Sequence, residues 1–168
     1  MDPELHTEAR PSLSALGKLC MALSAASVLL MAIITTAEVL MRALLGISIQ
    51  VSNELGGYLL VSLAFFSFAV CQERNAFIQV DFLQDRLSPR GRALSQVVFG
   101  VICIAFCAIL EFYLIRLVLR SYESGSISAT LLYTPQWLPQ LSMPLGMGAF
   151  ILALLRTLIR DLRQLVGR

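Results

Sequence analysis

The sequence predicts an all-α integral membrane protein in which four helices cross the bilayer. Of its 168 residues, 57% are hydrophobic and 14% are charged, and the mean hydropathy is +0.76. A soluble domain is usually about 45–50% apolar and about 25% charged. This composition excludes an ordinary cytosolic enzyme, a disordered chain and a protein that binds nucleic acid. The length fits a single four-helix membrane domain, residues 1–168.

The apolar residues gather in four stretches that lack charged side chains over most of their length. Each supplies roughly 20 residues, enough to cross a ~30 Å hydrocarbon layer as a helix, because backbone polar groups in lipid must pair within the segment. The predicted spans are residues 19–41, 55–72, 93–115 and 137–155, each boundary being approximate. We expect the first span to be retained, because the leader of residues 1–18 is acidic rather than basic. Pro135, Pro139 and Pro144 predict a kinked or delayed start of the fourth span.

The basic residues predict that both termini are cytoplasmic. Ten of the 13 lysine and arginine residues lie in the leader, in the second loop (residues 73–92) or in the C-terminal tail. Basic loops stay on the cytoplasmic side. Tyr122, Tyr133 and Trp137 would then lie at the outer interface, where aromatic side chains are enriched.

Two connections have the pattern of amphipathic helices that lie at the membrane interface. In the tail, apolar side chains recur at helical spacing from Leu155 to Leu165, and Arg156, Arg160 and Arg163 occupy another face. These three arginines are candidate contacts for anionic lipid. Residues 77–83 of the second loop mix large apolar and polar side chains in a similar way. In both places a simple extension of the adjacent span is the alternative.

The sequence offers no residues for catalysis or for a cofactor. Its only histidine is His6, in the leader, so an intramembrane haem held by two axial histidines and a histidine proton relay are both excluded. Cys103 and Cys107 share a helix face and could form a metal pair, but no histidine lies near them, and packing as small apolar side chains is the better interpretation. We therefore expect no enzyme activity, no metal and no cofactor.

Charged and polar side chains near the predicted outer ends of the spans are the candidate functional residues. Glu38 and Arg42 are four residues apart and can pair on one helix face. We expect an outer ion-pair cluster or a contact with a partner subunit, and a proton or cation site is the alternative. The candidates are Glu38, Arg42, Glu54, Tyr58 and Glu111.

Several short motifs occur together in one order. Glu38-Val39-Leu40-Met41-Arg42 closes the first span, and Gly46-Ile47-Ser48 followed by Asn53-Glu54-Leu55-Gly56-Gly57-Tyr58-Leu59-Leu60 opens the second. Arg74 and Phe77-Ile78-Gln79-Val80-Asp81 follow the second span, and Pro135-Gln136-Trp137 and Pro144-Leu145-Gly146 precede the last. This ordered set resembles the small (Q-type) membrane subunit of tripartite ATP-independent periplasmic (TRAP) transporters, from about Met31 to Leu155. The sequence departs from the family pattern at Phe77, where a histidine is usual, and at Val51, where a tryptophan is usual.

The resemblance implies a non-catalytic subunit in the bacterial cytoplasmic membrane. Such a subunit braces a large elevator-type membrane subunit, which takes up a small organic anion of the carboxylate or sialic acid class on a sodium or proton gradient. A periplasmic binding protein delivers the anion, and the outer-loop residues Ser124, Tyr133 and Trp137 are candidate contacts for it. The alternative for this loop is an ordered lid that makes no such contact. Two alternatives are a self-contained proton-coupled transporter acting as a homodimer through Glu38, and a membrane anchor of a redox complex.

Overall fold

The four expected spans are present as four long helices. The computed structural model describes residues 13–46, 51–74, 89–129 and 132–166, and its helices are α1 (Ala15–Leu45), α2 (Val51–Glu73), α4 (Pro89–Glu123), α5 (Trp137–Gln140) and α6 (Ser142–Val166). Four helical segments are long and apolar enough to cross a membrane: Ala15–Leu45, Val51–Glu73, Ser95–Glu123 and Trp137–Arg160. The predicted fold class is confirmed. Three of the predicted spans fall inside these segments, and the third, residues 93–115, begins two residues before Ser95 but lies within α4.

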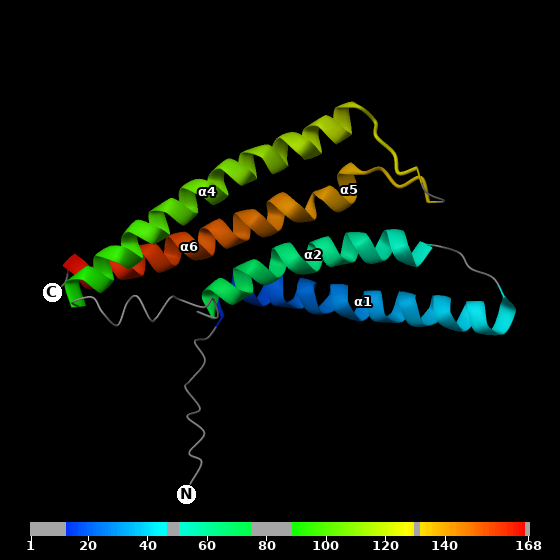
Figure 1. The fold of residues 1–168 in the computed structure, drawn as a ribbon, viewed down its shortest axis with the longest axis horizontal. Helices are drawn as coiled ribbons and strands as arrows, with labels where there is room; N and C mark the ends of the chain where they lie inside the picture. The colour runs from blue at the N-terminus through cyan, green and yellow to red at the C-terminus, as the bar shows by residue number, and fades with distance from the viewer. Residues whose placement is uncertain (1–12, 47–50, 75–88, 130–131, 167–168) are drawn as a thin grey trace, which may run out of the picture.

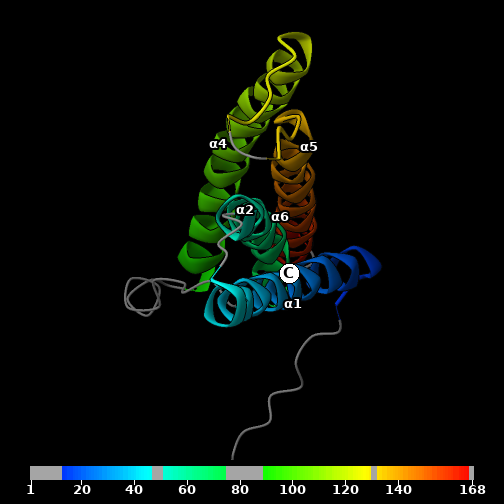
Figure 2. The ribbon, with the colours of Figure 1, turned by 90° about the vertical axis from the view of Figure 1, so that its right-hand side faces the viewer.

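The long helices lie in a row rather than in a closed bundle. The order across the row is α1, α2, α6, α4, and the main contacts join α1 with α2, α2 with α6, and α6 with α4 (Figure 1). In a view roughly along the helices, α2 lies between α1 and the pair formed by α4 and α6 (Figure 2). The helices alternate in direction, so α1 begins and α6 ends at the same end of the molecule (Figure 1). We call this the terminal end, and the end where α1 stops at Gly46 the hairpin end.

The first helix has well-defined caps at both ends. Ser14 is its N-cap, and the Ser14 hydroxyl accepts a hydrogen bond of 3.1 Å from the Gly17 amide. Gly46 ends the helix with φ 67°, a left-handed conformation that glycine adopts without a steric penalty, and its amide donates to the Arg42 carbonyl. The face of α1 turned to α2 carries its buried residues, Gly17, Cys20, Ser24 and Ser27. Small side chains at 3-4 spacing let the two helices approach closely.

A second close contact joins α2 and α6. A Cβ atom added to Gly146 would lie 2.7 Å from the carbonyl carbon of Phe65 and 2.7 Å from its Cβ atom. Only a glycine therefore fits where these helices meet. The surrounding core is small: Cys20, Ala69, Cys107, Met147, Ala149, Phe150 and Leu154.

The fourth predicted span consists of a short helix and a long helix that also includes the C-terminal tail. The helical path starts with the short α5, breaks at Leu141 and resumes as α6, which is the delayed start that Pro135, Pro139 and Pro144 predict. After Leu155, α6 continues without interruption to Val166, so the tail extends the span and is not a separate surface helix. The predicted amphipathic segment 77–83 lies outside the described residues.

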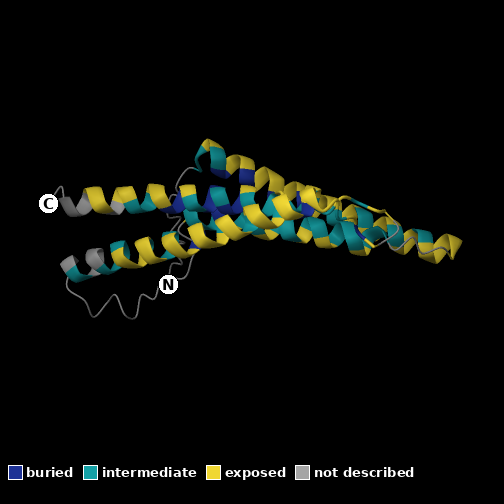
Figure 3. Cartoon of the chain, turned by 90° about the horizontal axis from the view of Figure 1, so that it is seen from above, coloured by how far each residue is buried: buried dark blue, intermediate teal, exposed yellow. Residues whose placement is uncertain are grey.

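Large apolar side chains cover the outward faces of the row. Among the residues coloured by burial, exposed and half-exposed ones outnumber the buried ones along the helices (Figure 3). Leu44 is 79% exposed on α1, and Phe99 and Phe106 are 62% and 61% exposed on α4. Patches of this extent do not face water in a soluble protein. They need lipid or another membrane protein against them.

Candidate functional site

Glu38 joins the two helices of the first hairpin. One oxygen of its carboxylate accepts a hydrogen bond of 2.9 Å from the Arg42 guanidinium. The other accepts 3.2 Å from the Ser52 amide and a further bond from the Ser52 hydroxyl. The amides in the first turn of α2 have no partner within the helix, and a carboxylate near them is stabilised by the helix dipole. The Glu38 side chain is only 12% exposed and Arg42 is 63% exposed, so the carboxylate is held between the helices and the guanidinium reaches outward.

Glu54 and Tyr58 form a second pair at the same end, one turn further along α2. The Tyr58 hydroxyl donates a hydrogen bond of 2.8 Å to the Glu54 carboxylate, and it also interacts with the side chain of Ser128. Ser128 is buried and belongs to the connection between α4 and α5. Tyr58 therefore ties the first hairpin to that connection. We call Glu38, Arg42, Ser52, Glu54 and Tyr58 the hairpin-end cluster.

The connection between α4 and α5 is an ordered loop in its described residues. Two backbone hydrogen bonds cross it, from the Ser128 amide to the Thr134 carbonyl (2.9 Å) and from the Gln136 amide to the Ser126 carbonyl (3.0 Å). The Tyr122 and Trp137 rings pack edge to face at its base, with centroids 5.6 Å apart. Ser124 and Tyr133, the other predicted contacts for a binding protein, are both exposed, and Tyr133 is 67% exposed.

Glu111 does not join the other four predicted cluster residues. The prediction placed it near the end of the third span, but α4 extends to Glu123, which is 12 residues or about 18 Å further along the helix. Helix α4 contacts α6 and α5. Glu111 faces α6, because a Cβ atom added to Gly148 of α6 would lie 3.7 Å from the Glu111 Oε1 atom. Its Oε2 atom is buried without a hydrogen-bond partner. The predicted span ends at residue 115, before Arg116, whereas the helix continues to Glu123.

A polar contact that the sequence analysis missed joins three helices at the terminal end. The Glu73 carboxylate, at the end of α2, accepts hydrogen bonds from the Ser14 amide (2.9 Å), the Ser14 hydroxyl (2.5 Å) and the Arg156 guanidinium (3.2 Å). Arg156 also donates to the Ser14 hydroxyl at 2.9 Å. The side chain of Glu73 is 12% exposed, and Gly17 leaves the space that its carboxylate fills. We call Ser14, Glu73 and Arg156 the terminal-end node.

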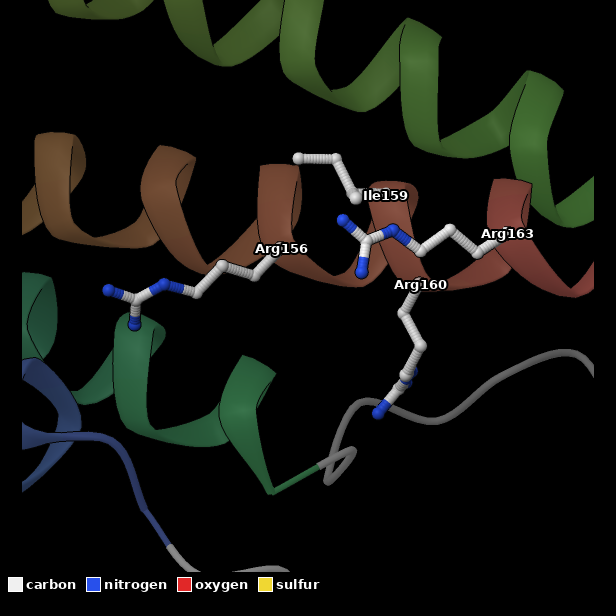
Figure 4. Close-up of a pocket in the computed structure, with 4 residues that line it drawn as sticks. All are labelled: Arg156, Ile159, Arg160 and Arg163. Atoms are coloured by element: carbon white, nitrogen blue, oxygen red, sulfur yellow. The ribbon is translucent and has the colours of Figure 1, made fainter.

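The three tail arginines line a hollow on one face of α6. Its volume is about 420 Å³, and its lining residues are Arg156, Ile159, Arg160 and Arg163 (Figure 4). Arg156 reaches toward the end of α2, and Arg160 and Arg163 lie further along α6 (Figure 4). All three predicted lipid contacts are exposed, and Arg156 is in addition bonded within the terminal-end node.

In the described residues the structure brings together no group of three or more histidine, cysteine, aspartate or glutamate side chains that could hold a metal ion. Cys103 and Cys107 are free thiols on α4, and Cys107 is buried in the core. The arrangement that remains is polar contacts holding helix ends together, with apolar faces left uncovered.

The fold is that of a multi-pass membrane protein, with four helices long and apolar enough to cross a membrane and polar contacts that join neighbouring helices. Residues 31–164 of the chain match the family described as "Tripartite ATP-independent periplasmic transporters, DctQ component". The chain belongs to this family, which confirms the resemblance found in the sequence, and it is a small component of a TRAP transporter. No curated protein sequence matches the chain.

Proposed function

We propose that this chain is a passive brace for the large membrane subunit of a TRAP transporter. The observation that carries the proposal is the open row of four helices with uncovered apolar faces in a member of this family. A row of this kind can lie against a second membrane protein along its whole length. The large subunit would carry the substrate and the coupling ion, and a periplasmic binding protein would deliver a small organic anion of the carboxylate or sialic acid class.

The outer face of α1 is the proposed surface for the large subunit. Opposite the face that packs on α2, this face has exposed small residues at helical spacing: Ala22, Ala25, Ala32, Thr36 and Ala43. In lipid, helix association depends on close backbone approach, which small residues permit. Leu29, Ile33 and Leu40 lie among these small residues, whereas the outer face of α4 has exposed aromatic side chains, Phe99, Phe106 and Tyr113, which suit contact with lipid chains.

Co-purification tests this surface. A tagged form of this chain should bring down the large subunit in equal amount from detergent extracts. The pair Ala25→Leu and Ala32→Leu should reduce that yield at least several-fold, because each leucine separates the two backbones. The matched control is Ala105→Leu with Ala108→Leu, two exposed alanines on α4, which should leave the yield unchanged. Equal loss in both pairs, or loss only in the control, contradicts the assignment to α1.

Both termini are proposed to face the cytoplasm of a bacterial inner membrane. The support is the excess of arginine in the second loop and the tail of the sequence. A green fluorescent protein fused to the C-terminus should fluoresce, and alkaline phosphatase at the same position should be inactive. The opposite pair of results would reverse the orientation.

In this orientation the hairpin-end cluster and the loop from Ser124 to Trp137 face the periplasm. We assign the cluster a holding role within the chain, because Glu38 is already bonded to Arg42 and Ser52. The alternative of a self-contained proton-coupled homodimer would need the Glu38 carboxylate to bind and release protons within the span. Proton-coupled efflux by the purified chain alone, lost in Glu38→Gln, would favour that alternative over the brace. The exposed Ser124 and Tyr133 are the proposed contacts for the binding protein, with Trp137 at the base of the loop.

A further inference from the structure

Two arginines lie on the outward face of α4, near the hairpin end. The buried residues Cys107 and Ser121 mark the side of this helix that turns toward α6 and α5. Arg116 follows Cys107 by nine residues, or two and a half turns, so it lies on the opposite side, and Arg120 lies about one turn further. Both arginines are exposed. Since α4 is at one edge of the row, they lie on the side away from the other long helices (Figure 1).

Neither arginine is paired with a carboxylate in the part of the chain that the structure describes. The Arg116 guanidinium lies over the Phe112 ring, 5.2 Å from its centroid. This contact uses the face of the guanidinium and leaves the N–H groups at its edge able to donate. Glu123 is exposed three residues beyond Arg120, and no ion pair joins the two in the described residues. Glu111 faces α6 instead, so the outward face has a net positive charge.

The two arginines lie at the level expected for lipid headgroups. The apolar segment Ser95–Glu123 has 29 residues, about 43 Å at 1.5 Å per residue, which exceeds the ~30 Å hydrocarbon layer even when the helix is tilted. Its ends therefore reach the headgroups. Arg120 lies in the last turn, close in sequence to Tyr122, whose ring packs on Trp137 as aromatic side chains do at a membrane interface. Arg116 is one turn deeper.

An apolar stripe leads from the arginines toward the middle of α4. Four exposed residues precede Arg116 by 4, 7, 11 and 14 positions, which is the spacing of one helix face: Phe112, Ile109, Ala105 and Ile102. An acyl chain that begins at the level of the arginines would lie along this stripe. A soluble anion would gain nothing from it, so the combination of charge and stripe favours a lipid.

We propose that Arg116 and Arg120 hold the phosphate group of an anionic phospholipid in the leaflet at the hairpin end. Residues one turn apart on a helix have Cβ atoms about 5–6 Å apart, so both guanidinium groups can donate to the oxygens of one phosphate. Phe112 keeps the Arg116 guanidinium in place for this contact, and one acyl chain lies along the apolar stripe. The proposal rests on the proposed function in leaving the outer face of α4 to lipid and in placing the hairpin end at the periplasm.

Photolabelling of the full chain in vesicles, without the large subunit, tests the site. The vesicles would consist of phosphatidylcholine with a small fraction of a phosphatidylglycerol that has a photoreactive group next to its phosphate, and labelled residues would be mapped by peptide mass spectrometry. We expect labelling of the wild type to concentrate on residues 112–120.

Two variants separate the site from general charge attraction. R116Q/R120Q should be labelled there roughly 30-fold less, the size expected when two arginines near an anionic surface are neutralised. F112L keeps every charge but loses the ring contact, so its labelling should fall about two- to five-fold.

The matched control is K18Q/R74Q, which removes two exposed positive charges at the terminal end and should leave the labelling of α4 unchanged. Equal losses in the two glutamine variants, or wild-type labelling in F112L, would show general charge attraction and overturn the site. Suppression of wild-type labelling by millimolar inorganic phosphate would assign the arginines to a soluble anion and overturn the lipid. Since the vesicles contain no large subunit, either failure is separate from that of the brace, which co-purification tests.

Discussion

The contact at Gly146 gives the sharpest prediction about what holds the row together. In Gly146→Ala, the added methyl carbon would lie 2.7 Å from two carbon atoms of Phe65, one of them in the backbone of α2. Non-bonded carbon atoms prefer separations of about 3.5–4.0 Å. Helices α2 and α6 must therefore move apart by about 1 Å, because a backbone atom cannot rotate away as a side chain can.

The magnitude follows from two opposing effects. Overpacking of a well-packed contact destabilises by about 1–3 kcal/mol, and a backbone clash belongs in the upper part of that range, about 2–3 kcal/mol. Alanine in a helix is favoured over glycine by roughly 0.5–1 kcal/mol. The net loss expected for Gly146→Ala is about 1–2 kcal/mol in the free energy of unfolding.

Gly57→Ala is the matched control. Gly57 lies in α2, and a Cβ added there meets nothing within 4 Å, so only the helix preference acts and the variant should gain roughly 0.5–1 kcal/mol. Both variants can be unfolded reversibly in mixed micelles of non-ionic detergent and dodecyl sulfate, with helix content followed by circular dichroism. The two should differ by about 2–3 kcal/mol. Equal stability of Gly146→Ala and Gly57→Ala would refute the close approach of α2 and α6.

Three further substitutions test the polar contacts by the same unfolding measurement. Glu73→Ala should lower the free energy of unfolding by about 1–2 kcal/mol, which is less than for a fully buried ion pair because Arg156 is 55% exposed. Its effect should not add to that of Gly17→Ala, because both substitutions disturb the Glu73 carboxylate. Strict additivity of the two effects would count against the terminal-end node. Glu38→Gln should lose at most about 1 kcal/mol and leave uptake by the assembled transporter intact, whereas abolished uptake with unchanged stability would indicate a proton site. Glu111→Met should be neutral or about 1 kcal/mol more stable, because it removes the buried Oε2 atom that has no partner, and a large loss would mean that Glu111 is bonded after all.

The spans could be predicted from the sequence because a bilayer demands length and apolarity, and both are local properties. The pair of Glu38 and Arg42 could be anticipated for a similar reason, since four residues along a helix make one turn. The boundaries were less accurate. Helix α4 continues through Arg116 and Arg120 to Glu123, because a helix does not stop where the charges begin.

The arrangement of the helices could not be read from the sequence. Four spans are compatible with a closed bundle or with an open row, and the choice depends on contacts between distant segments. Glu73 illustrates the difficulty: it looks like a charge marking the end of a span, and its role depends on Ser14 and Arg156, which are 59 and 83 residues away along the chain. Glycines such as Gly17 and Gly146 can indicate a close contact between helices, but only the structure shows that both of these contact α2.

Uptake by reconstituted vesicles tests the central claim most directly. The large subunit, the binding protein and an imposed ion gradient would be combined with and without this chain, and accumulation of a labelled organic anion would be measured. We predict uptake only when this chain and the large subunit are both present, and none with this chain as the sole membrane component. Equal uptake by the large subunit without this chain, or uptake by this chain without the large subunit, would contradict the brace.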